Sequence, residues 1–177
     1  AADVVVLVLD AAQGAADQDA AIAGDAHKAG RGIIIAANKW DLMKEHGPDA
    51  YKVFDDAVHQ QMKFVDYAPV LHISAKTGER TQKLLETIDK VAASRHLRVP
   101  TPELNRFIEQ VTREHPPVSP GHRNVRVLYA AQTGIAPPTF VLFTNVATKL
   151  HFSYERYLEN RLREKYGFTD EEVEFFD

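Results

Sequence analysis

Two short polar segments of this sequence each follow directly on an apolar run. Asn38-Lys39-Trp40-Asp41 comes after the run at residues 33–37, and Ser74-Ala75-Lys76 comes after the run at residues 69–73. In open α/β sheets ligands bind at the carboxyl ends of the strands, so polar groups in these two places can reach one ligand. Two segments in equivalent places indicate a binding site more strongly than either segment does alone.

The side chain with the most specific chemistry in these segments is the carboxylate of Asp41. It can accept two parallel hydrogen bonds, which matches the N1–H and the 2-amino group of guanine, whereas adenine has an acceptor at N1 and no 2-amino group. An unpaired buried carboxylate costs about 1–3 kcal/mol or more, and polar sites of this kind reject the wrong ligand by about 10⁴-fold. In this interpretation the N–H of Ala75 meets guanine O6, while Ser74 holds the loop and Asp41. We expect Trp40 to pack inside the protein.

Residues 1–97 alternate apolar runs of strand length with helical patterns. The strands are expected at residues 4–9, 33–37 and 69–73, and the helices at residues 17–29 and 49–62 and around residues 84–92. This order predicts an α/β fold with three parallel strands joined by helices. On the helix at residues 49–62 we expect an inward face of Val53, Ala57 and Val58. On the last helix we expect the stripe Leu84, Leu85, Ile88, Val91 and Ala92.

Two prolines close together mark a boundary, because Arg98-Val99-Pro100-Thr101-Pro102 cannot continue a helix. We therefore predict one domain at residues 1–97 and a second, α+β domain at residues 98–177. Its expected order is helix, strand, strand, helix, strand. The expected features are a helix capped by Thr101 with Leu104, Phe107, Ile108 and Val111 inside, strands at 125–130 and 139–144 around a loop at 132–138, a helix at 153–166 stopped by Gly167, and a strand from Val173.

The two polar segments resemble the guanine-recognition motifs of the Ras-like, translation-factor-related GTPases. Further segments narrow the resemblance to the C-terminal part of the EngA/Der family, which are bacterial proteins with two GTPase domains. These segments are residues 2–11, Gln18-Asp19, Ala26-His27, Leu104-Asn105-Arg106, His115-Pro116-Pro117, Pro137-Pro138-Thr139-Phe140 and residues 157–164. The resemblance covers the whole chain. It implies part of a Ras-like P-loop GTPase fold, from the second GTPase domain, followed by a KH-like domain.

The same resemblance implies a role for each residue of the two segments. Asp41 would read guanine N1 and N2, Asn38 would approach N7 and tie the two loops together, and the stem of Lys39 would lie along the base. Ala75 would contact O6 through its N–H, and Lys76 would flank the base. GTP or GDP is the implied ligand, with Mg²⁺ held by residues outside this chain. The implied partners are the 50S ribosomal subunit, whose assembly the family assists, its rRNA, and an upstream GTPase domain.

A phosphate-binding loop of the form G-x-x-x-x-G-K-[ST] does not occur in this sequence. Ala75-Lys76-Thr77-Gly78 lacks the preceding glycine and loop. We therefore expect the chain to be a fragment of a GTPase that has its P-loop and switches upstream. Such a fragment would not hydrolyse GTP unaided, and the strand at residues 4–9 would keep an unpaired edge.

Charge leaves a second function open. The chain has 21 Lys and Arg against 25 Asp and Glu, but residues 98–169 hold 10 basic against 6 acidic residues. This excess mildly favours an anionic partner. Arg156, Arg161, Arg163 and Lys165 either meet RNA phosphates or belong to a solvated helix face with interleaved glutamates. The alternative function is a nucleotide-independent module that binds rRNA or protein, and GDP titration distinguishes it from the GTPase interpretation.

Composition excludes several other classes of protein. The longest aliphatic run, at residues 4–9, is far shorter than the roughly 20 residues that span a bilayer, so we expect no membrane segment. There is no cysteine, which excludes disulfides and thiolate metal sites. We expect a cytoplasmic, ribosome-associated protein.

Overall fold

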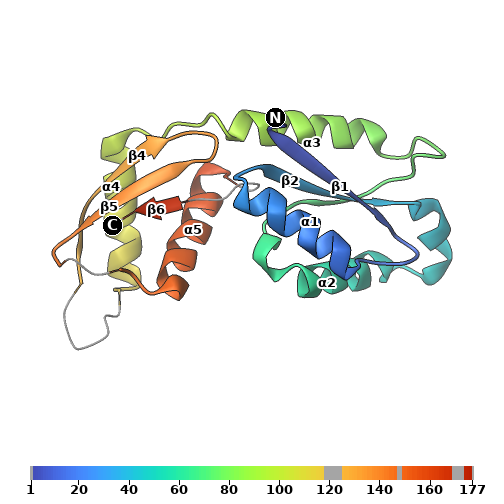
Figure 1. Ribbon diagram of the computed structural model, residues 1–177, viewed down its shortest axis with the longest axis horizontal. Coiled ribbons are helices and arrows are strands. Elements are labelled where there is room, and N and C mark those ends of the chain that lie inside the picture. The colour runs from blue at the N-terminus through green and yellow to red at the C-terminus, as the bar shows by residue number, and fades with distance from the viewer. Residues whose placement is uncertain (1, 118–124, 147–148, 169–173, 177) are drawn as a thin grey trace. The chain divides into compact units, whose positions relative to one another are not determined.

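The computed structural model describes residues 2–117, 125–146, 149–168 and 174–176 (Figure 1). The chain divides into two compact units, of which the first ends at Ser94 and the second comprises Arg95–Phe168 with the C-terminal strand. Each unit has its own hydrophobic core, and the two cores share no residue. Within the described ranges, none of the helices combines the length and the apolar character needed to cross a bilayer.

The first unit alternates strands and helices as the sequence predicts. Its elements are β1 (Val4–Asp10), α1 (Asp17–Lys28), β2 (Gly32–Asn38), the 3-10 helix η1 (Trp40–His46), α2 (Ala50–Gln61), the 3-10 helix η2 (Lys63–Val65), β3 (Val70–His72) and α3 (Thr81–Ser94). The three strands form one parallel sheet in the order β1-β2-β3. β1 and β2 are therefore each followed by a helical crossover that returns the chain to the same end of the sheet.

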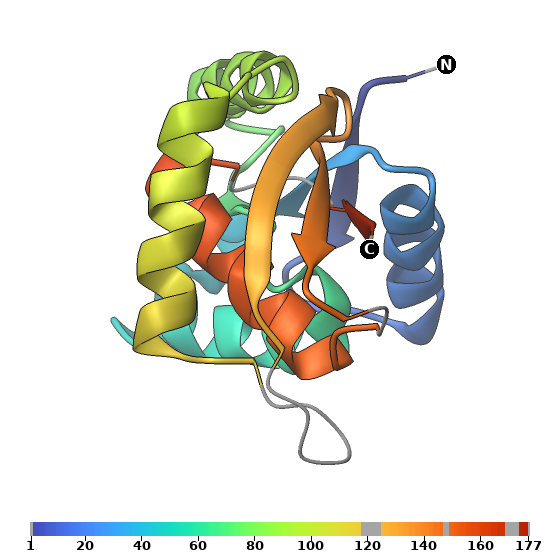
Figure 2. The same ribbon diagram turned by 90° about the vertical axis from the view of Figure 1, so that its left-hand side faces the viewer.

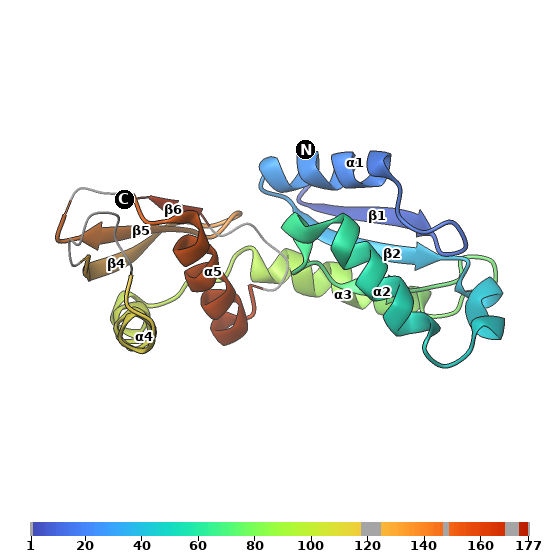
Figure 3. The same cartoon turned by 90° about the horizontal axis from the view of Figure 1, so that it is seen from below.

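The central strand β2 is buried on both faces, which explains its uninterrupted apolar sequence. Ile33 and Ile35 belong to a core cluster that also contains residues of α1 and α2, so these two helices cover one face. The intervening Ile34 is fully buried as well. Helix α3 packs against β1 and β2 and lies on the side of the sheet opposite α1 (Figure 3).

Two of the predicted helix faces are partly wrong. In α2 the buried row is Ala50, Phe54 and Val58, at spacing i, i+4, i+8, whereas Val53 is 66% exposed. Ala57 is exposed too. The row that contains the large Phe54 side chain faces the core because it removes more apolar surface from water than the row around Val53 would.

In α3 the helix itself is confirmed but its predicted stripe is too wide. Leu85 is 57% exposed, while Val91 is buried and Leu84 and Ile88 are partly buried. Leu85 lies about 100° around the helix from Leu84, so a helix on a sheet cannot bury both of them equally.

The second unit has the predicted order of helix, strand, strand, helix, strand. Its elements are α4 (Thr101–Glu114), β4 (Val127–Gly134), β5 (Thr139–Thr144), α5 (Phe152–Tyr166) and β6 (Glu174–Phe176). β4 and β5 are antiparallel, and β6 joins β5 in parallel. Val173, the predicted start of this strand, lies outside the described residues. Helices α4 and α5 bury their apolar residues against Ala130, Phe140 and Leu142 of the sheet (Figure 2).

The four predicted inward residues of α4 are all buried, and Gly167 ends α5 in a left-handed conformation as expected. Two local predictions are wrong. Thr101 is the first residue of α4 rather than its cap, because the helix begins directly after Pro100. Gln132 lies in β4 and not in a loop, since its buried side chain accepts from Val99 N–H at 2.8 Å and donates to Leu97 C=O at 3.0 Å. These bonds allow a polar residue inside the strand.

Candidate functional site

The two polar segments meet at the carboxyl ends of β2 and β3. Asn38 is the last residue of β2, Asp41 lies in the first turn of η1, and Ser74 follows β3. Two hydrogen bonds connect the segments: Asn38 Oδ1 accepts from Ala75 N–H at 2.9 Å, and Trp40 N–H donates to the carbonyl of Ile73 at 3.0 Å. Because β2 and β3 are adjacent and parallel, their ends lie side by side, as the sequence argument required.

The carboxylate of Asp41 is held by Ser74. Ser74 Oγ donates to Asp41 Oδ1 at 2.6 Å and accepts from the N–H of Thr77 at 3.3 Å. Ser74 is fully buried, so the packed residues around it restrict the position of this hydroxyl. The arrangement orients the carboxylate before any ligand arrives, and among the described residues it leaves Asp41 Oδ2 without a hydrogen-bond donor. A ligand with two adjacent N–H donors fits such a group.

A cavity of about 240 Å³ lies at this place, and it is lined by Asn38, Lys39, Asp41, Leu42, Ser74 and Lys76. Five of the six residues predicted from the sequence therefore line one cavity. The sixth, Ala75, is joined to it through the bond to Asn38. Leu42 was missed. It is 54% exposed although apolar, and its place directly after Asp41 was the only signal in the sequence.

Asp10 was also missed. Lys39 adopts a left-handed backbone conformation (φ 64°), and its Nζ lies 2.6 Å from Asp10 Oδ2. Asp10 ends β1 and is paired in register with Asn38, so it occupies the same position in its strand as Asn38 does in β2. That equivalence was readable in the sequence. The hydrogen bond from Lys39 lowers the pKa of Asp10 below its ordinary value.

Trp40 packs inside the protein, as expected. It is buried, and its ring centroid lies 4.1 Å from that of His72 and 4.7 Å from that of Tyr51. The Nε2 atom of His72 lies 2.7 Å from Asp55 Oδ1. The ring contacts of Trp40 anchor the backbone between Lys39 and Asp41 to the core, which helps to keep Asp41 at the cavity wall.

Comparison with known proteins bears on both units. Residues 1–94 match the family model of the elongation factor Tu GTP binding domain, and residues 98–176 match that of the KH-domain-like C-terminal domain of EngA bacterial GTPase enzymes. The chain is 44% identical to the GTPase Der of Desulforamulus reducens over 98% of its own length and 39% of the relative, and 45% identical to that of Desulfitobacterium hafniense over 94% and 37%. The chain belongs to the EngA/Der family. It spans about two fifths of the length of these EngA/Der relatives.

Not all of the four cationic side chains that we considered for RNA contact are exposed in the KH-like unit of this EngA/Der chain. Arg163 is buried and its guanidinium lies 3.4 Å from Glu159 Oε2, so it is not placed to meet an RNA phosphate. Burial raises the pKa of the Glu159 carboxyl. Arg161 is partly buried and pairs with Glu114 at 3.1 Å, whereas the side chains of Arg156 and Lys165 are exposed. The spacing of charges along α5 could not predict which of these cations are buried. Arg163 is buried beside Leu162, on the inner face of the helix.

The described part of this EngA/Der chain contains no group of three acidic or histidine side chains that could hold a metal ion.

Proposed function

We propose that the cavity between the ends of β2 and β3 binds the guanine base of GTP or GDP. The observation that carries this proposal is the carboxylate of Asp41, fixed by Ser74 at 2.6 Å and forming part of the wall of a cavity of about 240 Å³. A preoriented carboxylate accepts the N1–H and the 2-amino group of guanine together. Adenine offers no pair of donors on that edge, so the same group gives specificity for guanine.

The other residues of the cavity take complementary roles in this proposal. Asn38 approaches N7 of the base, and the stems of Lys39 and Lys76 and the side chain of Leu42 contact its faces. The N–H of Ala75 meets O6. Because Ala75 N–H already donates to Asn38 Oδ1, a bound base has to share this donor with Asn38 or take it over.

Exchange of donor and acceptor on the base tests the proposal. Xanthine has an oxygen where guanine has the 2-amino group, so Asp41→Asn, which can donate, is expected to bind xanthosine diphosphate more tightly than GDP. We expect GDP affinity to fall about 100-fold, since a hydrogen bond to a charged group contributes about 1.5–3 kcal/mol. Isothermal titration with both nucleotides measures this. Asp56→Asn, an exposed change on α2, is the matched control. No GDP binding by the wild-type chain, or an unchanged preference in Asp41→Asn, contradicts the proposal.

For the whole protein we propose GTP hydrolysis coupled to assembly of the large ribosomal subunit, in the cytoplasm. The support is the family resemblance, and the proposed partners are the 50S subunit, its rRNA and a further GTPase domain of the same protein. Mg²⁺ belongs to this proposal as the ion that accompanies the nucleotide phosphates. Co-sedimentation with purified 50S subunits tests the partner, with binding expected to change between GDP and a non-hydrolysable GTP analogue. Salt-sensitive rRNA binding without any GDP binding would instead favour a nucleotide-independent interaction module.

A further inference from the structure

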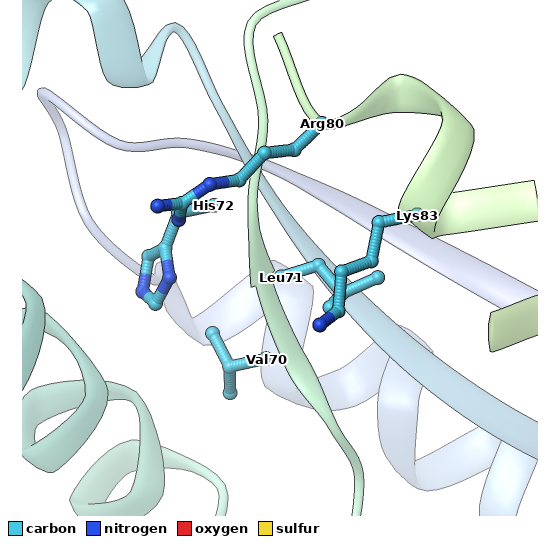
Figure 4. A pocket seen from close by; sticks show the side chains of 5 residues that line it. All are labelled: Val70, Leu71, His72, Arg80 and Lys83. Carbon is cyan, nitrogen blue, oxygen red and sulfur yellow. The ribbon is translucent and has the colours of Figure 1, made fainter. Parts of the chain in front are cut away.

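A second cavity lies at the outer edge of β3. It has a volume of about 370 Å³ and is lined by Val70, Leu71, His72, Arg80 and Lys83, none of which lines the proposed guanine cavity. Figure 4 shows the side chains of Arg80 and Lys83 extending alongside β3, with Arg80 reaching toward His72 and Lys83 lying beside Leu71 and Val70. β3 is an edge strand of the described sheet.

Both cations of this cavity lack a carboxylate partner among the described residues. Glu79, the neighbour of Arg80 in sequence, is bonded to Lys44 at 2.8 Å. Asp55, which approaches from α2, is bonded to His72 at 2.7 Å. Neither of these two carboxylates is therefore paired with Arg80 or Lys83.

Arg80 and Lys83 both occupy positions that are unfavourable for the stability of the folded chain. Arg80 has a left-handed backbone (φ 59°), a conformation that is unfavourable for a non-glycine residue. Its guanidinium carbon lies 5.3 Å from the centroid of the Tyr51 ring, which holds the charge over the cavity. Lys83 lies in the first turn of α3, where the helix dipole disfavours a cation and where this helix has no acidic residue.

The edge of β3 adds backbone donors. Pro69 C=O accepts from Ile35 N–H and Ile73 N–H donates to Ala37 C=O, both at 2.9 Å. Because consecutive residues of a strand direct their backbone groups to opposite sides, the N–H and the C=O groups of Val70 and His72 point away from β2, toward the open edge. The edge itself thus offers both donors and acceptors, and the guanidinium and the ammonium are the groups that favour a compact anion with several oxygens.

We propose that this cavity binds a backbone phosphate of RNA. This inference rests on the proposed function, which gives the protein an rRNA partner, and it places one RNA contact on the first unit. An acidic peptide that adds to the sheet as a further strand fits less well, because β3 has only three residues and Arg80 extends from the start of α3 to the ring on α2. Short edge strands and charged side chains are features that oppose strand addition.

The test measures how the affinity for a fluorescein-labelled 12-nucleotide oligouridylate depends on salt. The variant is the double substitution Arg80→Gly and Lys83→Gln in the 177-residue chain, since glycine adopts the left-handed backbone without strain. Each phosphate neutralised on a single strand contributes about 0.7 to the slope of log K against log salt concentration, so loss of the one phosphate contact proposed here predicts a slope smaller by about 0.7. Lys90→Gln, an exposed change further along α3, is the matched control and is expected to leave the slope unchanged.

The inference is overturned if the wild-type chain does not bind the oligouridylate, or if the double variant has the same salt slope as the wild-type chain. An equal decrease of the slope in Lys90→Gln would overturn it as well. So would polyglutamate that displaces the RNA from the wild-type chain but not from the double variant, at equivalent charge concentration. GDP titration of the same variants separates the two proposals. If the double variant keeps both its GDP affinity and its RNA slope, the phosphate cavity is rejected and the guanine site is not. Absence of GDP binding in the wild-type chain rejects the guanine site, whatever the RNA result.

Discussion

At the scale of single residues, Ser74 does the most to prepare the proposed guanine site. Ser74→Ala removes the hydroxyl that donates to Asp41 Oδ1 at 2.6 Å and accepts from Thr77 N–H. A lost hydrogen bond to a charged group corresponds to about 1.5–3 kcal/mol, so we expect GDP to bind at least about tenfold more weakly. Titration calorimetry measures the change, and Ser153→Ala in α5 is the matched control. GDP affinity within twofold of wild type would show that Asp41 does not depend on this bond.

The ion pair between Lys39 and Asp10 predicts a pH effect. The hydrogen bond from Lys39 lowers the pKa of Asp10 in the folded state below its ordinary value of 3.8. A lowered folded pKa means that Asp10 contributes stability above the pKa it has when unfolded, and that this contribution is lost as the pH falls through the folded pKa. Carboxyl NMR titration is expected to give a midpoint below 3.8 in the wild-type chain and a higher one in Lys39→Gln. Lys52→Gln on α2 should leave the midpoint where it was, and an unshifted midpoint in Lys39→Gln would contradict the assignment.

The proximity of the six proposed site residues was predictable, because their position after two adjacent strands is written in the sequence. Asp41 and Ser74 needed nothing more than adjacent parallel strands. What the sequence did not reveal is the competition for one donor. Asn38 Oδ1 accepts the Ala75 N–H that was assigned to guanine O6, and only the distance between the two loops decides that bond.

At the scale of elements, Gln132 ties β4 to the segment that precedes α4. Its side chain accepts from Val99 N–H and donates to the carbonyls of Leu97 and Gly134. Gln132→Met keeps the length of the side chain but leaves these buried groups unpaired, so we expect a loss of about 1–3 kcal/mol in the free energy of unfolding of the second unit. Urea denaturation measures it. The neighbouring exposed change Thr133→Met is expected to have less than half of that effect, and equal effects would show that the buried bonds contribute nothing.

The elements themselves were predicted well, and their faces less well. Apolar runs at strand length located β1, β2 and β3, although only β2 is buried on both faces, and Val8 of β1 is 57% exposed. The helix faces depended on rotation about the helix axis, and several rows of α2 contain apolar residues. Phe54 and not Val53 faces the core, which follows from packing against the sheet and not from periodicity. The inward position of Gln132 likewise depends on partners more than 30 residues away.

At the scale of the whole molecule, the chain holds two hydrophobic clusters that have no residue in common. The single tryptophan, Trp40, belongs to the cluster of the first unit, directly beneath the proposed guanine site. Its fluorescence therefore reports on the unfolding of the unit that carries this site. Amides of α4 and α5 report on the other unit through hydrogen exchange.

This separation of signals predicts how nucleotide affects stability. A ligand that binds only the folded state at 100 times its Kd adds about 2.7 kcal/mol to the free energy of unfolding. We expect GDP at that concentration to shift the Trp40 transition in urea by this amount, whereas ADP at the same concentration leaves it in place. In Asp41→Asn, xanthosine diphosphate and not GDP should produce the shift. We expect the free energy of opening that hydrogen exchange gives for α4 and α5 to rise by less than the free energy of unfolding that Trp40 fluorescence gives. The reason is that none of the core residues of α4 and α5 lies in the cluster around Trp40. An equal gain with ADP would mean that the stabilisation comes from the phosphates and not from base recognition by Asp41.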